Sequence, residues 1–259
     1  MKSKREIKQF QEFLLNSWPA KHYYFLNGWI LRFTEGVTSR ANSVFPIRYT
    51  GTQKSLENDI TIVENAYKAY RLPAVYTMHE YYEPKNLKIK LLERGYQIFD
   101  HTIALGTNID EIHLGDVKND FEYLLFDSRI NGISDFLGRF SKRNEREQII
   151  IQEINQRLVI PNKCYMVVKS NNDIIGTLFA VLLPQGFLYV GDVFVHPDFR
   201  RQGVASSMLI KLRDNWQFSS YVRMIWLQVE KVNKSALDLY RKLGMTKLYE
   251  YYYIKHDIN

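Results

Sequence analysis

LYVGDVFVHPDFRRQGVASSMLIKLRDNWQFSSYVRMIWLQVEKVNKSALDLYRKLGM, residues 188 to 245, is the stretch that decides the fold. Its first part, Leu188 to Val195, is an apolar and β-branched run. Pro197 ends this run because proline cannot donate to a strand ladder and restricts the residue before it. The apolar positions that follow recur every four residues, the period of a helix, at Val204, Met208, Leu212 and Trp216. The order strand, loop, helix is therefore predicted here.

The loop between this strand and this helix carries an arginine pair and a glycine. Gly203 and Ala205 fall at the predicted helix N-terminus, where unpaired backbone N–H groups and the helix dipole favour an anion. Small residues let a phosphate approach the backbone, and Arg200 and Arg201 add positive charge. We predict a pyrophosphate site at this loop. The alternative is an ordinary strand-to-helix turn with a solvated arginine pair.

A second strand and a second helix follow. Tyr221 to Val229 is another apolar run. Asn233 is expected to cap the N-terminus of the next helix, and Gly244 is expected to follow its C-terminus. Asn233 and Tyr240 are seven residues apart, so they lie on nearly the same helix face. The start and the middle of this helix can thus face one ligand.

These residues resemble the GNAT acetyltransferase superfamily over about the last half of the chain. The resemblance rests on Arg200-x-x-Gly203-x-Ala205 after Val195-His196-Pro197, and on Asn233-x-x-Ala236-x-x-x-Tyr240-x-x-x-Gly244. It implies acetyl-CoA or another acyl-CoA as acyl donor, with the pyrophosphate on the backbone amides from Arg201 to Ser206. It also implies that the pantetheine chain pairs with the backbone of Phe194 and Val195, where the two strands splay apart. The implied cofactor-binding residues are Phe194, Val195, Arg200, Arg201, Gln202, Gly203, Val204, Ala205, Ser206, Asn233 and Tyr240.

The resemblance also implies roles in the transfer itself. Acyl transfer from a thioester to an amine with a pKa of roughly 10 needs a proton acceptor, a stabilised oxyanion and a proton for the thiolate. Tyr240 is the implied acid, and a backbone N–H near Val195 polarises the thioester carbonyl; a tyrosine that only packs is the alternative. Asp192 and Glu230 are the candidate bases, directly or through water. For each of them an ordinary hydrogen-bonded or surface carboxylate is an equal alternative.

Composition sets further limits. A chain of 259 residues with 46% hydrophobic residues can bury one large core or two modest ones. No apolar run approaches the roughly 18 residues of a membrane span, and the N-terminus has no apolar signal-peptide core, so a cytoplasmic protein without membrane contact is expected. Cys164 is the single cysteine and lies in an apolar run, which predicts a buried thiol. The histidines show no ligand spacing, so no metal is expected.

The first half of the chain repeats the element order of the second half. Residues 74 to 105 read as strand, helix, glycine, strand, and aligning Gly95 with Gly244 places Leu91 at the position of Tyr240. The first half has no Arg-x-x-Gly-x-Ala loop. It resembles the first half of tandem-GNAT proteins in Trp29-x-x-Arg32 followed by Arg40-Ala41-Asn42-Ser43.

We therefore predict an α/β (α+β) protein of two GNAT-like domains, each a mixed, mostly antiparallel twisted sheet flanked by helices. Residues 1–112 form a degenerate domain and residues 118–259 the catalytic domain that binds acyl-CoA, with a linker in the polar stretch Gly106 to Asp120. Helices are expected at residues 4–15, 56–70, 84–94 and 130–158, the last broken near Ser141. The remaining strands are expected at residues 22–26, 28–34, 74–79, 96–105, 121–126, 164–168, 174–183 and 249–253.

The predicted function is that of an N-acetyltransferase, acting on a small amine or a peptide that the sequence does not identify; the oligomeric state is equally open. Candidates for the acceptor wall are Phe136, Arg139, Phe140 and Arg143, although a core face with solvated arginines explains them as well. A non-catalytic acyl-CoA-binding or regulatory protein is the alternative. Nucleic-acid binding is disfavoured, despite a net charge of +7, because the 35 lysines and arginines are scattered without an aromatic-basic stripe.

Overall fold

The computed structural model describes residues 3–113, 120–215 and 221–256, so Trp216 and the middle of the predicted linker lie outside it. The chain divides into two compact units. The first comprises Met1–Ile103, Glu230–Val232 and Tyr249–Asn259, and the second comprises Ala104–Val229 and Asn233–Leu248. This division differs from the boundaries expected from sequence, residues 1–112 and 118–259, because the last residues group with the first unit.

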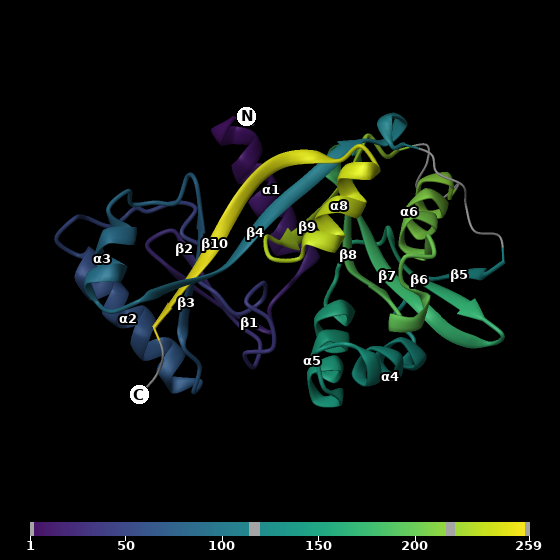
Figure 1. Cartoon of the computed structure of the whole chain (residues 1–259). Coiled ribbons are helices and arrows are strands. Elements are labelled where there is room, and N and C mark those ends of the chain that lie inside the picture. Colours follow the sequence, from purple (N-terminus) through teal and green to yellow (C-terminus); the bar gives the residue numbers. More distant parts are fainter. Residues whose placement is uncertain (1–2, 114–119, 216–220, 257–259) are drawn as a thin grey trace. The chain divides into compact units, whose positions relative to one another are not determined.

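The first unit combines a two-stranded hairpin with a sheet (Figure 1). Strands β1 and β2 pair antiparallel, and β3 pairs antiparallel with β10, with Thr77 opposite Tyr253. The strand order is β3-β10-β4. Its elements are α1 (Lys4–Ser17), β1 (His22–Leu26), β2 (Trp29–Phe33), α2 (Leu56–Ala69), β3 (Ala74–His79), α3 (Leu87–Glu93), the start of β4 (Gln97–Asn108) and the end of β10 (Thr246–His256).

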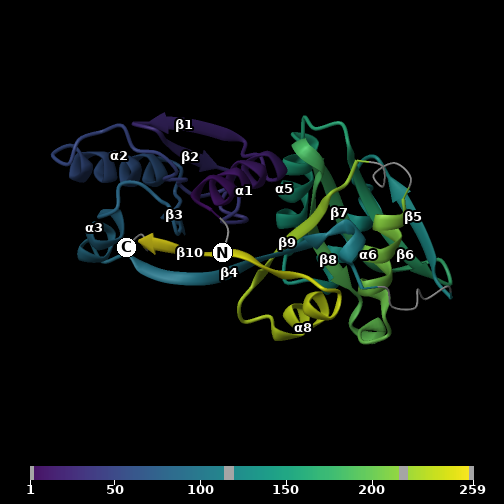
Figure 2. The ribbon, with the colours of Figure 1, turned by 90° about the horizontal axis from the view of Figure 1, so that it is seen from above.

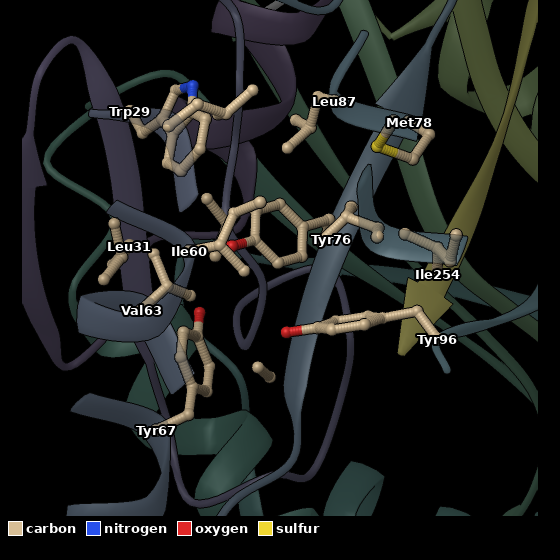
Figure 3. Close-up of a cluster of buried hydrophobic side chains, with 14 of the residues drawn as sticks. Trp29, Leu31, Ile60, Val63, Tyr67, Tyr76, Met78, Leu87, Tyr96 and Ile254 are labelled. Carbon is tan, nitrogen blue, oxygen red and sulfur yellow. The ribbon is translucent and has the colours of Figure 1, made fainter. Parts of the chain in front are cut away.

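An aromatic and aliphatic core fills one side of this first sheet. Figure 3 shows the side chains of β2 and β3 meeting those of α2. The rings of Trp29 and Tyr76 lie edge to face with centroids 5.8 Å apart, and Ile60 and Val63 of α2 are fully buried against them. Side chains alternate between the two faces of a strand, so Arg32 points to the face of β2 opposite to Leu31. Arg32 is also buried, and it donates to the Ser43 hydroxyl at 2.9 Å.

The second unit is a mixed, mostly antiparallel sheet with helices packed on it (Figure 2). The strand order is β10-β4-β9-β8-β7-β6-β5, with β8 and β9 parallel and β5 to β8 antiparallel. Helix α6 packs against β6, β7 and β8, and α4 packs against β7. The remaining elements are η1 (Ile109–Glu111), β5 (Glu122–Phe126), α4 (Asn131–Phe140), α5 (Glu145–Gln156), β6 (Lys163–Ser170), β7 (Asp173–Leu183), η2 (Pro184–Gly186), β8 (Phe187–Val195), η3 (Pro197–Phe199), α6 (Val204–Asp214), β9 (Met224–Glu230) and α8 (Lys234–Lys242).

Local capping explains several predicted boundaries. Asn144 accepts a hydrogen bond from the Glu147 N–H, and the Glu147 carboxylate accepts from the Asn144 N–H, so a capping box starts α5 after the predicted break near Ser141. Asn171 and Asn172 adopt positive φ between β6 and β7, as the predicted hairpin turn requires. The sheets and helices of the two units confirm the α/β (α+β) fold class that was predicted from sequence.

Some predicted boundaries are wrong. The helix expected from Pro84 begins at Leu87, and the strand expected from Tyr221 begins at Met224. The predicted linker begins too early, because β4 continues through Gly106 to Asn108. A Cβ on Gly106 would lie 2.9 Å from Leu248 Cδ1. This glycine therefore does not form a turn; it leaves room for the side chain of Leu248 on the neighbouring strand β10. None of the described helices is both long enough and apolar enough to cross a lipid bilayer.

Candidate active site

Strand β8 carries a bulge near its C-terminal end. Thr177 of β7 lies opposite Phe194, and Phe179 lies opposite Gly191, so β8 contains one extra residue between these pairs. Asp192 occupies the bulge with φ 47°, in the left-handed region that non-glycine residues seldom adopt. The end of β8 is therefore turned locally away from regular strand geometry.

The parallel ladder between β8 and β9 stops at the same place. Its last pair is Val190 opposite Leu227, although β8 continues to Val195 and β9 to Glu230. The backbone of Phe194 and Val195 thus lies beyond the ladder on the β9 side, as expected for two strands that splay apart. The Val195 carbonyl accepts a hydrogen bond from Arg200 Nε at 3.2 Å.

The loop after β8 presents a run of backbone N–H groups. Arg201 and Gly203 adopt positive φ, 61° and 83°, and helix α6 begins at Val204 with the Ser207 N–H bonded to the Gly203 carbonyl. In the described part of the chain, no acceptor is found for the six backbone N–H groups from Arg201 to Ser206. Alternating positive φ in such a loop forms an anion-binding concavity. The side chain of Gln202, by contrast, closes the loop by donating to the Asp198 carbonyl at 2.8 Å.

Helix α8 has the ends that the sequence predicted. The Asn233 side chain accepts from the Ala236 N–H at 3.2 Å, and Gly244 follows the helix with φ 85°. Because the Asn233 oxygen also accepts from the Ser235 hydroxyl at 3.1 Å, it is engaged in capping.

Tyr240 lies on the buried side of α8, and only 6% of it is exposed. Burial, and then the phenol of Tyr189 on β8, raise the pKa of Tyr240 above its usual range. Among the described hydrogen bonds, none uses the Tyr240 hydroxyl. With its pKa raised, Tyr240 holds its proton throughout the neutral range, as an ordinary phenol with a pKa of about 10 also does.

The two candidate bases lie in different surroundings. Asp192 accepts a hydrogen bond from Arg143 Nη1 at 3.0 Å, and Arg129 Nη1 lies 3.8 Å from its other carboxylate oxygen. Glu230 ends β9, is exposed and falls in the first unit, where it lines a cavity of about 290 Å³ with Asp100, His101, Lys231 and Val232.

The predicted acceptor-wall residues divide into two groups. Phe136 and Phe140 of α4 pack against the end of β8, with ring centroids 5.7 Å from Phe194 and 4.2 Å from His196, respectively. Arg143 bonds to Asp192, whereas Arg139 is exposed. Sequence reasoning missed Arg129, which is buried under the same helices, because a single arginine in a loop gives no local indication of its partner.

The start of α2 in the first unit has different surroundings from the start of α6. Near the start of α2, the buried Asp59 carboxylate accepts from the Tyr49 hydroxyl at 2.6 Å and from the Asn27 amide at 2.9 Å. The first half of the sequence also has no Arg-x-x-Gly-x-Ala loop. This agrees with a degenerate first half.

Replacing Asp59 with alanine should lower the free energy of unfolding by about 2 to 3 kcal/mol, because it strands Tyr49 and Asn27 without their charged acceptor. Chemical denaturation monitored by circular dichroism measures the loss. Asn58→Ala is the matched control, since Asn58 is exposed on the same turn. Equal stability of the two variants would contradict a structural role for Asp59.

Other chemistry finds less support in the described residues. No group of three or more His, Cys, Asp or Glu side chains among them could hold a metal ion. Cys164 is buried in β6, and burial raises the pKa of its thiol to about 12, as expected for a structural cysteine.

Comparison with known proteins agrees with this geometry. Residues 133–245 match the acetyltransferase (GNAT) family, and residues 5–90 match the family described as probable histone acetyltransferase Rv0428c C-terminal. The chain is 24% identical over 253 residues to the uncharacterized N-acetyltransferase YobR of Bacillus subtilis, covering 96% of this chain and 98% of that protein.

Solved structures share the fold at low sequence identity. A GCN5-related N-acetyltransferase from Kribbella flavida superposes with a TM-score of 0.68 at 11% identity, covering 99% of this chain and 96% of that one. A tandem GNAT protein from the clavulanic acid biosynthesis pathway gives a TM-score of 0.60 at 9% identity, covering 81% and 72%. Residues 133–245 thus match the acetyltransferase (GNAT) family, as the motifs in that part of the chain predicted, and the solved structures share the fold of the chain.

Proposed function

We propose that the protein is an N-acetyltransferase that uses acetyl-CoA as the acyl donor and transfers the acetyl group directly to an amine. The observation that carries the proposal is the run of six backbone N–H groups from Arg201 to Ser206 at the start of α6, for which the described residues offer no acceptor. A doubly charged pyrophosphate needs several donors close together, and positive φ at Arg201 and Gly203 turns the N–H groups to one side.

The open side of β8 suits the rest of the donor. Beyond Val190 the strand has no partner on the β9 side, so the backbone groups of Phe194 and Val195 can pair with the amides of a pantetheine chain. Arg200 currently donates to the Val195 carbonyl and would have to release it for that pairing. Its guanidinium would then be free to join the phosphates.

Tyr240 supplies the proton in this proposal. Acetyl-CoA brings an activated thioester whose thiolate must be protonated when it leaves. A phenol with its usual pKa of about 10 already holds a proton at neutral pH, and burial, which raises the pKa of Tyr240, keeps it protonated. A backbone N–H near Val195 would donate to the thioester oxygen as negative charge develops there.

The amine must lose a proton; the sequence predicted Asp192 or Glu230 for this step, and of the two Glu230 is the one proposed, because Asp192 lies between Arg143 and Arg129. Phe136 and Phe140, packed at the end of β8, are the proposed wall of the acceptor site. The acceptor is a small amine or a peptide amine. The buried, reduced Cys164 agrees with the cytoplasmic location that belongs to this proposal.

Isothermal titration of the purified protein with acetyl-CoA and with CoA tests the donor, and release of free thiol in the presence of an amine panel tests the transfer. We expect saturable binding of both ligands and amine-dependent thiol release. Failure of both ligands to bind would refute the proposal. Binding without thiol release from any amine would favour the alternative, a non-catalytic acyl-CoA-binding protein.

A further inference from the structure

Asp192 is the centre of a charged cluster that joins the bulge of β8 to two helices. Its carboxylate accepts from Arg143 Nη1 at 3.0 Å and lies 3.8 Å from Arg129 Nη1. Arg143 belongs to the loop between α4 and α5, and Arg129 precedes α4. The carboxylate is 14% exposed and the Arg129 side chain 3%, so the cluster is largely shielded from water.

Arg129 extends the cluster into both helices. Its Nη2 donates to the Gln148 oxygen of α5 at 2.7 Å, and its Nε donates to the Ser134 hydroxyl of α4 at 3.3 Å. Gln148 in turn donates to the Ser141 hydroxyl at 3.2 Å, at the end of α4. One guanidinium therefore holds the helix pair together and approaches the strand.

The position of Asp192 explains why the strand needs such an anchor. A non-glycine residue at φ 47° is strained, and such residues persist only where the surrounding structure holds them. The bulge that contains Asp192 follows directly after the last β8–β9 pair at Val190. Holding Asp192 thus sets the direction in which Phe194 and Val195 leave the ladder.

The same contacts argue against a proton-accepting role. One carboxylate oxygen of Asp192 already accepts from Arg143, and the second lies near Arg129. A carboxylate between two guanidinium groups is an ion-pair partner first. The described contacts of Asp192 with titratable groups are those with Arg129, Arg143 and the Tyr165 phenol, and none of these three would relay a proton from an amine at neutral pH.

We propose that Arg129, Asp192 and Arg143 form a clamp in which Asp192 is a positioning residue: it fixes the bulge of β8 and locks the α4–α5 pair over it. The clamp keeps the open edge of Phe194 and Val195 in place for the acyl donor and seats the aromatic wall of α4 beside it. This inference rests on the proposed function, because the edge that the clamp holds is the proposed site of the thioester.

A double-mutant cycle tests the clamp. Asp192→Asn, Arg143→Ala and the double variant are each expected to lower kcat by about 10- to 100-fold, since misplacement of an acyl donor costs that much. Their effects should not add, because either change opens the same contact. Arg143→Lys should restore part of the rate, and Lys142→Ala, exposed on the same loop, should retain it.

The pH profile separates a clamp from a base. If Asp192 is a clamp residue, kcat of Asp192→Asn still falls at low pH as it does in the wild type, and only its maximal value is lower. Loss of that fall at low pH, or additive effects in the cycle, would overturn the proposal and make Asp192 the proton acceptor. Unchanged kcat in both single variants would overturn it too.

Backbone hydrogen exchange keeps the clamp testable if the proposed function fails. If the wild type transfers to no amine, the transferase proposal falls, and exchange at the amides of Val193 to Val195 then decides the clamp. Faster exchange in both single variants, with no further increase in the double variant, would support it. Exchange equal to that of the wild type would refute it.

Discussion

Tyr240→Phe is expected to lower kcat by about 100- to 1,000-fold while the dissociation constant for acetyl-CoA changes by less than about threefold. The substitution keeps the ring that fills the buried face of α8 and removes only the hydroxyl. In the proposed reaction that hydroxyl protonates the departing thiolate, so its loss affects the transition state and not donor binding. Steady-state thiol release and calorimetric titration measure the two quantities.

The pH dependence gives a second readout with a definite sign. An acid acts only while protonated, so activity should persist below the pKa of Tyr240 and fall above it. Because burial raises that pKa, the alkaline fall should lie above pH 10, the value for a free phenol. Tyr189→Phe, the other phenol beside α8, is the control and should cost less than tenfold in kcat. Equal rates for Tyr240→Phe and the wild type would remove Tyr240 from the mechanism.

Features encoded by neighbouring residues could be predicted from the sequence. Asn233 caps α8 through a contact three residues away, and Gly203 and Gly244 adopt the positive φ that few other residues tolerate. The strand, loop and helix around Arg200 follow from the spacing of apolar residues and from Pro197, which ends the strand. Such features depend on local sterics and local hydrogen bonds, which the sequence displays directly.

Features built from distant residues could not be predicted. The bulge at Asp192 depends on pairing with Thr177 and Phe179, and its charge partner Arg129 lies far away along the chain. Gly106 has the composition of a linker but sits inside β4, where its missing side chain makes room for Leu248. Strand pairing and buried ion pairs are decided by tertiary structure, which overrides local preference.

The anion site itself is the second place where a single substitution should have a large effect. Gly203→Glu is expected to weaken acetyl-CoA binding by more than about 100-fold, because removing or opposing several charge-assisted hydrogen bonds costs about 1.5 to 3 kcal/mol each. The new carboxylate would lie at the N–H groups that start α6 and would oppose the charge of a bound pyrophosphate. Calorimetric titration with acetyl-CoA measures the change.

The chain offers a matched control for the backbone strain that this substitution adds. Gly95 has φ 86°, close to the 83° of Gly203, and a Cβ there would meet nothing nearer than 4.0 Å. Gly95→Glu should therefore cost a similar 1 to 2 kcal/mol of stability, roughly the penalty of a left-handed non-glycine residue, without affecting binding. If both variants lose stability and only Gly203→Glu loses acetyl-CoA, the loss belongs to the anion site and not to folding. Wild-type affinity in Gly203→Glu would mean that the loop is a solvated turn, and the acyl donor would have to be sought elsewhere.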